Sequence, residues 1–193
     1  IRICLVGSEM CIRDRYETAD KYKSWSSEGY ERRFAKIAGS YYPIDNFKLS
    51  YSFRVREEDE WLNWIDGNEL AVYDLTQKII SFNMNWFEGR KHEVRLKSQF
   101  VALDAENPIS LISNPDGYLF NYTSDVKPFT QGIASFQIRY KYEIAPLSYI
   151  YAVYTKGGRV YDDENERNTS KVFKDPWRNP DNEIFSLKFR LKF

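Results

Sequence analysis

The sequence predicts an all-β protein: an antiparallel, up-and-down transmembrane β-barrel, of which this chain is the C-terminal portion. Three observations predict this fold. Apolar and polar residues alternate along several segments, the connections between those segments alternate between short and long, and aromatic residues gather near the short connections. Alternation with a period of two indicates a strand with two different faces, and alternating connection lengths are typical of membrane barrels.

The expected strands follow from their patterns, in chain order. The regular ones are "NFKLSYSFRVR", "HEVRLKSQFVA", "SFQIRYKYEIA" and the closing "NEIFSLKFRLKF". Less regular apolar segments at residues 31–42, 70–86 and 147–156 fill the gaps between them. Together they give about seven strands, and no segment has a convincing helical period.

The connections between these strands predict which end of the barrel faces which side. "PIDN", "FEGRK" and "APL" are short, whereas residues 57–69, 104–130 and 157–183 form long connections rich in Asp, Asn, Gly and Pro. All 7 prolines are expected between strands, since proline is excluded from sheet interiors. In a membrane barrel the tight turns face the periplasm and the long loops face outside.

The closing strand decides which face would meet lipid. Lys188, Arg190 and Lys192 alternate with apolar residues, and a cation facing lipid at mid-membrane costs about 2–4 kcal/mol, so the cations must face the lumen. The lipid-facing residues are then Phe185, Leu187, Phe189, Leu191 and Phe193. An alternating strand with a terminal Phe resembles the signal by which insertion machinery recognises outer-membrane barrels. Counting back through the short and long connections predicts that the C-terminus lies on the short-turn, periplasmic side.

Cationic residues would line the barrel interior. They are Arg54, Arg56, Arg95, Lys97, Arg139, Lys141, Lys188 and Arg190. Such a lining would favour anions in a pore. Equally, it could pair with Glu93, Glu143 and a plug, which would only satisfy interior charge. The sequence slightly favours the second alternative.

The polar and aromatic residues of the turns and loops predict no catalytic, cofactor or metal site. His92 is the only histidine and is expected at a short turn, away from any nucleophile. The acidic run "YDDENERN" offers Asp162, Asp163, Glu164 and Glu166, but it lacks the spacing of a calcium loop. Trp61, Trp64 and Trp177 could stack on sugar rings, although interfacial anchoring is the expected role.

Composition limits the remaining possibilities. Lys plus Arg and Asp plus Glu both number 28, so no net charge favours nucleic acid as a partner. No apolar run is long enough for a membrane helix, which excludes a helical membrane protein.

Residues 1–15 contain both cysteines and resemble translated sequencing-adaptor DNA, so we expect them to be non-native. Residues 16–193 would then be the C-terminal part of a barrel truncated upstream.

Three stretches resemble one family: the residues from Glu60 to Ala105, those from Phe129 to Arg159, and the closing "NEIFSLKFRLKF". They are similar to the outer-membrane β-barrel domain of unknown function 5916, over residues 45–193. The match is carried by Trp61 and Trp64, the turn "NWFEGRKHEVRLK" and the arginine strand into "APLS". Tyr154 departs from the pattern, where Trp is expected. The family has no agreed catalytic residues.

The resemblance implies a function. In this family the barrel commonly follows a carbohydrate-binding module of the family 9 type in Gram-negative envelope proteins. We therefore expect a non-enzymatic outer-membrane segment that anchors such a module and could bind or pass glycan-derived solutes. Its partners would be outer-membrane lipid, the insertion machinery and carbohydrate. The alternatives are an outer-membrane hydrolase with a site on the long loops and a soluble β-sandwich binding module.

Overall fold

The computed structural model describes residues 2–5, 10–19, 32–162 and 169–192, with side chains from residue 32 onward except in the first turn of the helix. The elements are β1 (Arg2–Leu5), β2 (Met10–Ala19), β3 (Arg32–Ile44), β4 (Phe47–Asp66), β5 (Glu69–Glu88), β6 (His92–Ser113), β7 (Leu119–Asn121), β8 (Phe129–Ala145), β9 (Ser148–Asp162), α1 (Thr169–Arg178) and β10 (Asn182–Arg190). Strands dominate, and the all-β prediction is confirmed.

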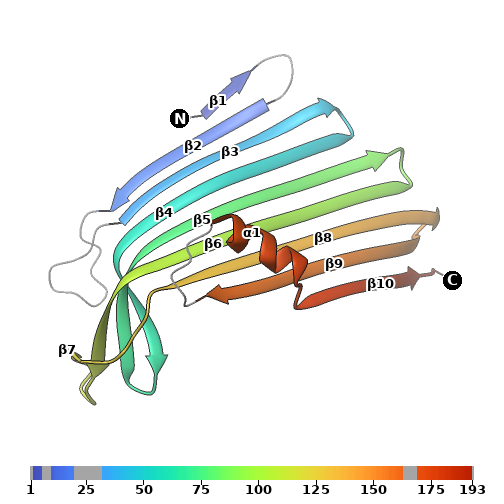
Figure 1. The fold of residues 1–193 in the computed structure, drawn as a ribbon. Coiled ribbons are helices and arrows are strands. Elements are labelled where there is room, and N and C mark those ends of the chain that lie inside the picture. The colour runs from blue at the N-terminus through green and yellow to red at the C-terminus, as the bar shows by residue number, and fades with distance from the viewer. Residues whose placement is uncertain (1, 6–9, 20–31, 163–168, 193) are drawn as a thin grey trace.

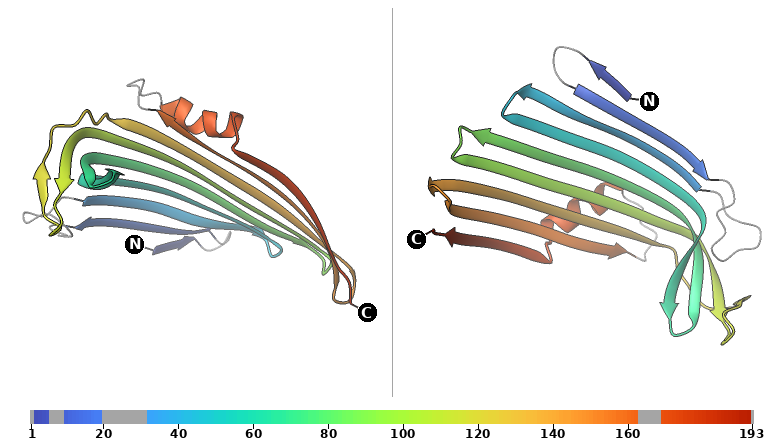
Figure 2. Two further views of the ribbon diagram at one scale, coloured as in Figure 1. Left: turned by 90° about the horizontal axis from the view of Figure 1, so that it is seen from below. Right: turned by 180° about the vertical axis from the view of Figure 1, so that it is seen from behind.

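The strands form one antiparallel meander in the order β1-β2-β3-β4-β5-β6-β8-β9-β10, with β7 paired to the far end of β6 (Figure 1). The sheet is strongly bowed along its strands (Figure 2). Within the described residues β10 pairs with β9 alone, and no pairing joins it to β1. The sheet is therefore open, and closure into a barrel stays a prediction.

The short connections lie where the sequence places them. β3 and β4 are joined at Asp45 and Asn46, β5 and β6 across Gly89, and β8 and β9 across Pro146 and Leu147. Gly89 has a φ of 57°, a conformation that favours glycine in a tight turn. All three turns lie at the same end of the sheet (Figure 1), as an up-and-down meander requires.

Two of the expected long connections are wrong, because the strands continue through them. β4 and β5 each run for 20 residues and meet in a turn at Gly67, so residues 57–69 belong to a long hairpin. Similarly, β6 extends to Ser113 and takes up much of 104–130. Bulges at Glu60 and Asn107, both with positive φ, bend these extensions toward the concave side (Figure 2).

Proline placement needs the same correction. Pro108 lies inside β6 and Pro43 near the end of β3, although both were expected between strands. Each is next to an irregularity in pairing, which removes the need for the missing N–H. Pro176 lies inside α1 and is fully buried.

The third expected long connection, 157–183, contains the end of β9 and the helix α1. The helix lies across β6, β8 and β9 on the convex side of the sheet (Figure 2). It can approach closely because Gly132 and Gly158 have no side chain: a Cβ at either would overlap a backbone carbonyl oxygen, of Val172 or of Pro176. In the described ranges, no helix is both long and apolar enough to cross a membrane.

Candidate functional site: the concave face of the sheet

Strand register assigns every regularly paired residue to one of two faces. Residues opposite one another on neighbouring strands share a face, so the row Lys48, Asn85, Arg95, Arg139 and Val153 lies on one side. The helix packs against residues of the other side, through Gly132, Gly158 and Phe136. The row of Arg95 is therefore on the concave face, and α1 covers part of the convex face (Figure 2).

The convex face carries an apolar band. Its residues alternate with concave ones along Phe47–Val55 of β4, Ile80–Trp86 of β5, Val94–Ala102 of β6 and Phe185–Phe189 of β10, and none of them is charged. Charged convex residues lie only outside this band: Glu88 at its short-turn edge, and Glu57, Lys78, Asp104 and Lys156 at its other edge. Several band residues are exposed, including Phe53, Phe82, Phe185, Leu187 and Phe189.

From residue 32 onward, the concave face carries most of the cations of the regularly paired strands. They are Arg32, Lys36, Lys48, Arg54, Arg56, Arg95, Lys97, Arg139, Lys141, Arg159, Lys188 and Arg190. In the same residues, from 32 onward, the acids of the regularly paired strands on this face are Glu58, Glu93 and Glu143. A chain with a formal net charge of +0 thus has a strongly cationic concave face.

Near the short turns, Glu93 neutralises part of this charge. The Glu93 side chain is buried and forms ion pairs with Arg95, with Arg139 (Oε1 to Nη2, 3.6 Å) and with Lys141 (Oε2 to Nζ, 3.7 Å). Lys141 also lies over the ring of Tyr149, 4.4 Å from its centroid. One carboxylate therefore serves three cations, which leaves the cluster with a net positive charge.

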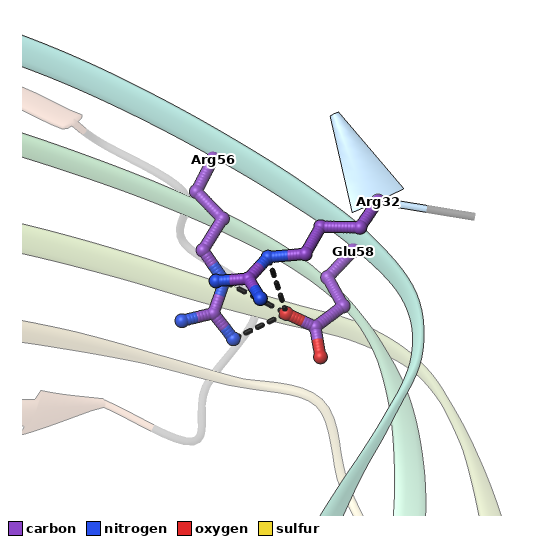
Figure 3. A network of polar contacts seen from close by, with 3 residues as sticks. All are labelled: Arg32, Arg56 and Glu58. Carbon is purple, nitrogen blue, oxygen red and sulfur yellow. Dashed lines mark hydrogen bonds and ion pairs between the residues drawn. The ribbon is translucent and has the colours of Figure 1, made fainter. Parts of the chain in front are cut away.

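A second cluster lies on β3 and β4, where the strands begin to bend (Figure 3). The buried carboxylate of Glu58 accepts hydrogen bonds from Nε (2.7 Å) and Nη2 of Arg56, and its Oε2 is 3.7 Å from Nε of Arg32. Arg54, next along the same face, lies over the ring of Phe34 at 5.7 Å. Here too the cations outnumber the acid.

Between the clusters the concave face has a polar hollow of about 400 Å³. It is lined by Ser81, Asn83, Lys97, Ser98, Gln99, Ser135, Phe136, Gln137 and Thr155. Lys97 is the only charged residue of the lining. Lys97 was expected from the sequence, but the amide and hydroxyl groups were not, because their only sequence signal is their place on the polar side of each strand.

A small apolar core lies beyond the hollow, under the bent β4–β5 hairpin. Tyr73 and Phe129 pack edge to face with ring centroids 5.2 Å apart, and Trp61 packs against Tyr73. The pKa of Tyr73 is raised to about 12, mainly because the side chain is buried. Tyr73 lies past Lys78, where the convex apolar band has ended. This core fixes the hairpin in its bent position.

The predicted tryptophan sites do not come together. Trp61 is packed in the small core, while Trp64 is 62% exposed near the hairpin tip, where its Nε1 donates to the carbonyl oxygen of Gly67. Trp177 lies on the convex side, against Phe136 and under Lys156. The three tryptophans therefore lie in three separate environments.

The structure places the other predicted residues as follows. Lys188 and Arg190 lie on the concave face of β10, and both are exposed. Leu191 is exposed just after β10, and Phe193 lies outside the described residues. Arg95 and Arg139 share Glu93 as an ion-pair partner, whereas Lys188 and Arg190 have no ion pair among the described residues.

The residues considered for catalysis or metal binding do not come together in the structure. His92 begins β6 beside a short turn, where its Nδ1 is 2.6 Å from the hydroxyl oxygen of Tyr140 and its ring stacks on Tyr142. Asp162 ends β9, while Asp163, Glu164 and Glu166 lie outside the described residues. In the part of the chain that the structure describes, no three His, Cys, Asp or Glu residues gather as metal ligands would.

No protein-family model, curated protein or solved structure matches the chain. The resemblance to the domain of unknown function 5916 therefore stays a prediction.

Proposed function

We propose that the chain is a membrane-inserted segment of an outer-membrane β-barrel, with its convex face toward lipid and its concave face toward an aqueous interior. The observation that supports this most directly is the division of charge between the faces. The convex face carries no charge between Glu88 and Lys78 on β5 or between Val94 and Asp104 on β6, while the concave face carries most of the cations.

The dimensions of the band support the same proposal. Phe47–Val55 spans nine residues, which at about 3.3 Å each gives about 30 Å of strand. With a tilt of about 45° this covers a height near the 25 Å of an outer-membrane apolar layer. Aromatic residues lie at the short-turn edge of the band, with Trp86, Tyr140 and Tyr142 near the ends of their strands.

The position of α1 also agrees with a membrane boundary. Trp177 lies against Phe100 of the apolar band and against Phe136 on the same face of β8. Its ring centroid is 5.0 Å from the Nζ of Lys156, where charge first appears on β9. Amphipathic rings such as indole settle at this level of a bilayer. In this arrangement α1 lies at the outer interface, opposite the periplasmic turns.

The segment is proposed to be non-enzymatic. Its role would be to anchor a carbohydrate-binding module and to provide a lined interior. The single histidine is held by Tyr140 and Tyr142 at the periplasmic end, far from the bent hairpin where a hydrolase would place its site. The hydrolase alternative predicts cleavage of a substrate, and the soluble β-sandwich alternative predicts a chain that does not insert into lipid.

The test is insertion into bilayers. The chain, unfolded in urea, is diluted into phosphatidylcholine vesicles and centrifuged in a density gradient, then treated with alkaline carbonate. We expect the chain to float with the vesicles, resist carbonate extraction and give an antiparallel β circular-dichroism spectrum. A chain that folds without lipid and stays at the bottom of the gradient would contradict the proposal and favour the soluble sandwich.

A further inference from the structure

The polar hollow on the concave face has a lining suited to one class of ligand. Its concave residues are Ser81, Asn83, Lys97, Gln99, Ser135, Gln137 and Thr155, which come from β5, β6, β8 and β9. Amides and hydroxyls both donate and accept hydrogen bonds, so together they match a molecule that carries many hydroxyl groups. The hollow has a volume of about 400 Å³, which is within the range of small-molecule sites.

The positive charge around the hollow indicates that its ligand is an anion. Lys97 is the only charged lining residue, and among the described residues it has no ion pair. The next concave residues toward the short turns are Arg95 and Arg139, which already share Glu93. Among the described residues no carboxylate lines the hollow, so no acidic side chain of the lining opposes an anion that enters it.

Geometry places the charge and the polar groups within reach of one ligand. Lys97 lies directly opposite Asn83 on β5 and Gln137 on β8, and Gln137 lies opposite Thr155 on β9. Neighbouring strands are about 4.8 Å apart, so this row extends across about 14 Å. A short oligosaccharide can therefore contact an ammonium group, two amides and a hydroxyl along one row.

We propose that this hollow binds an acidic sugar, with the ligand carboxylate on Lys97 and the ligand hydroxyls on Asn83, Gln99 and Gln137. The inference rests on the proposed function, since the hollow faces the barrel interior only if the convex face meets lipid. It adds the ligand class: an anionic, polyhydroxylated solute. Neutral sugars lack the charge, and simple anions lack the hydroxyl groups.

The experiment uses the full chain folded in detergent micelles or vesicles, with tri-galacturonate as the probe. Maltotriose serves as the neutral sugar and citrate as the anion without a sugar ring, and binding is measured by calorimetry. We expect tri-galacturonate to bind about tenfold more tightly than either. Lys97→Gln should remove about tenfold in affinity, while Lys48→Gln, on the same face outside the hollow, should leave binding unchanged.

Binding and flotation results together test the acidic-sugar site. Equal binding of citrate and tri-galacturonate, or a Lys97→Gln chain that binds like the original, would overturn it. Flotation with vesicles is measured on the same preparations. A chain that floats but does not bind tri-galacturonate refutes the acidic-sugar site alone, whereas a chain that does not float refutes the proposed function.

Discussion

Oε1 of Glu93 on β6 lies 3.6 Å from Nη2 of Arg139 on β8, and the same carboxylate pairs with Arg95 and Lys141. The glutamate side chain is buried, while all three cations are partly exposed. One acid therefore holds together the cationic end of the concave face. Without it, three positive side chains would repel one another across neighbouring strands.

Glu93→Gln removes that shared counter-charge. We expect it to lower the free energy of unfolding by about 1–3 kcal/mol, since a charged acceptor is lost from a buried position. Glu143→Gln is the matched control, because Glu143 lies on the same face of β8 and no ion pair to it is found among the described residues. Urea titration in vesicles measures both, and equal losses would contradict the role assigned to Glu93.

The two faces predict opposite responses to a new arginine. Leu96→Arg places a cation in the convex band and should cost about 2–4 kcal/mol in a bilayer. Gln99→Arg places the same group on the concave face three residues away and should cost much less. Unfolding in vesicles measures both variants, and a larger cost for Gln99→Arg would mean that the faces are assigned the wrong way round.

Gly132→Ala should displace α1 from the sheet, since the added Cβ would overlap the carbonyl oxygen of Val172. The control is Gly157→Ala, where a Cβ meets only the carbonyl oxygen of Ala134 at 3.3 Å. We expect trypsin to cleave after Arg178 about tenfold faster in Gly132→Ala, because local opening exposes the helix. Unchanged cleavage would show that α1 does not need this close approach.

Tyr73 should ionise later than an ordinary tyrosine. Its pKa is raised from 10.0 to about 12, mainly by burial, which disfavours the phenolate. Because the folded state favours the neutral form, this contribution to stability is complete below pH 10 and is lost as the pH rises toward 12. Ultraviolet titration should show a late phase whose amplitude falls by one tyrosine in Tyr73→Phe. A late phase of unchanged amplitude in the variant would contradict this assignment.

The sequence predicted the faces of the strands better than their lengths. In "NFKLSYSFRVR" the side-chain period alone decides which residues share a face, and the register of β4 confirms it. The continuation of β4 through "EEDEW" could not be seen, because acidic residues are poor strand formers and the bulge near Glu60 interrupts the alternation. The partners that hold this hairpin, such as Phe129, are distant in sequence.

The helix and the hollow escaped prediction for a related reason. α1 has 10 residues, too few for a stable isolated helix, and its position depends on Gly132 and Gly158 in strands that precede it. The hollow combines residues of four strands, so no local motif marks it. Lys97 was found because charge stands out in an alternating strand, whereas Asn83 and Thr155 have no such signal.

Spin-label accessibility along β6 tests the central claim most directly. Single cysteines at Arg95, Leu96 and Lys97, in a chain with Cys4 and Cys11 replaced by serine, are labelled and reconstituted in vesicles. We expect the label at position 96 to collide with oxygen dissolved in lipid, and those at 95 and 97 to collide with a water-soluble nickel chelate. If the label at 96 were shielded from both reagents while the labels at 95 and 97 still collided with the nickel chelate, the convex face would pack against protein. That result would contradict the account.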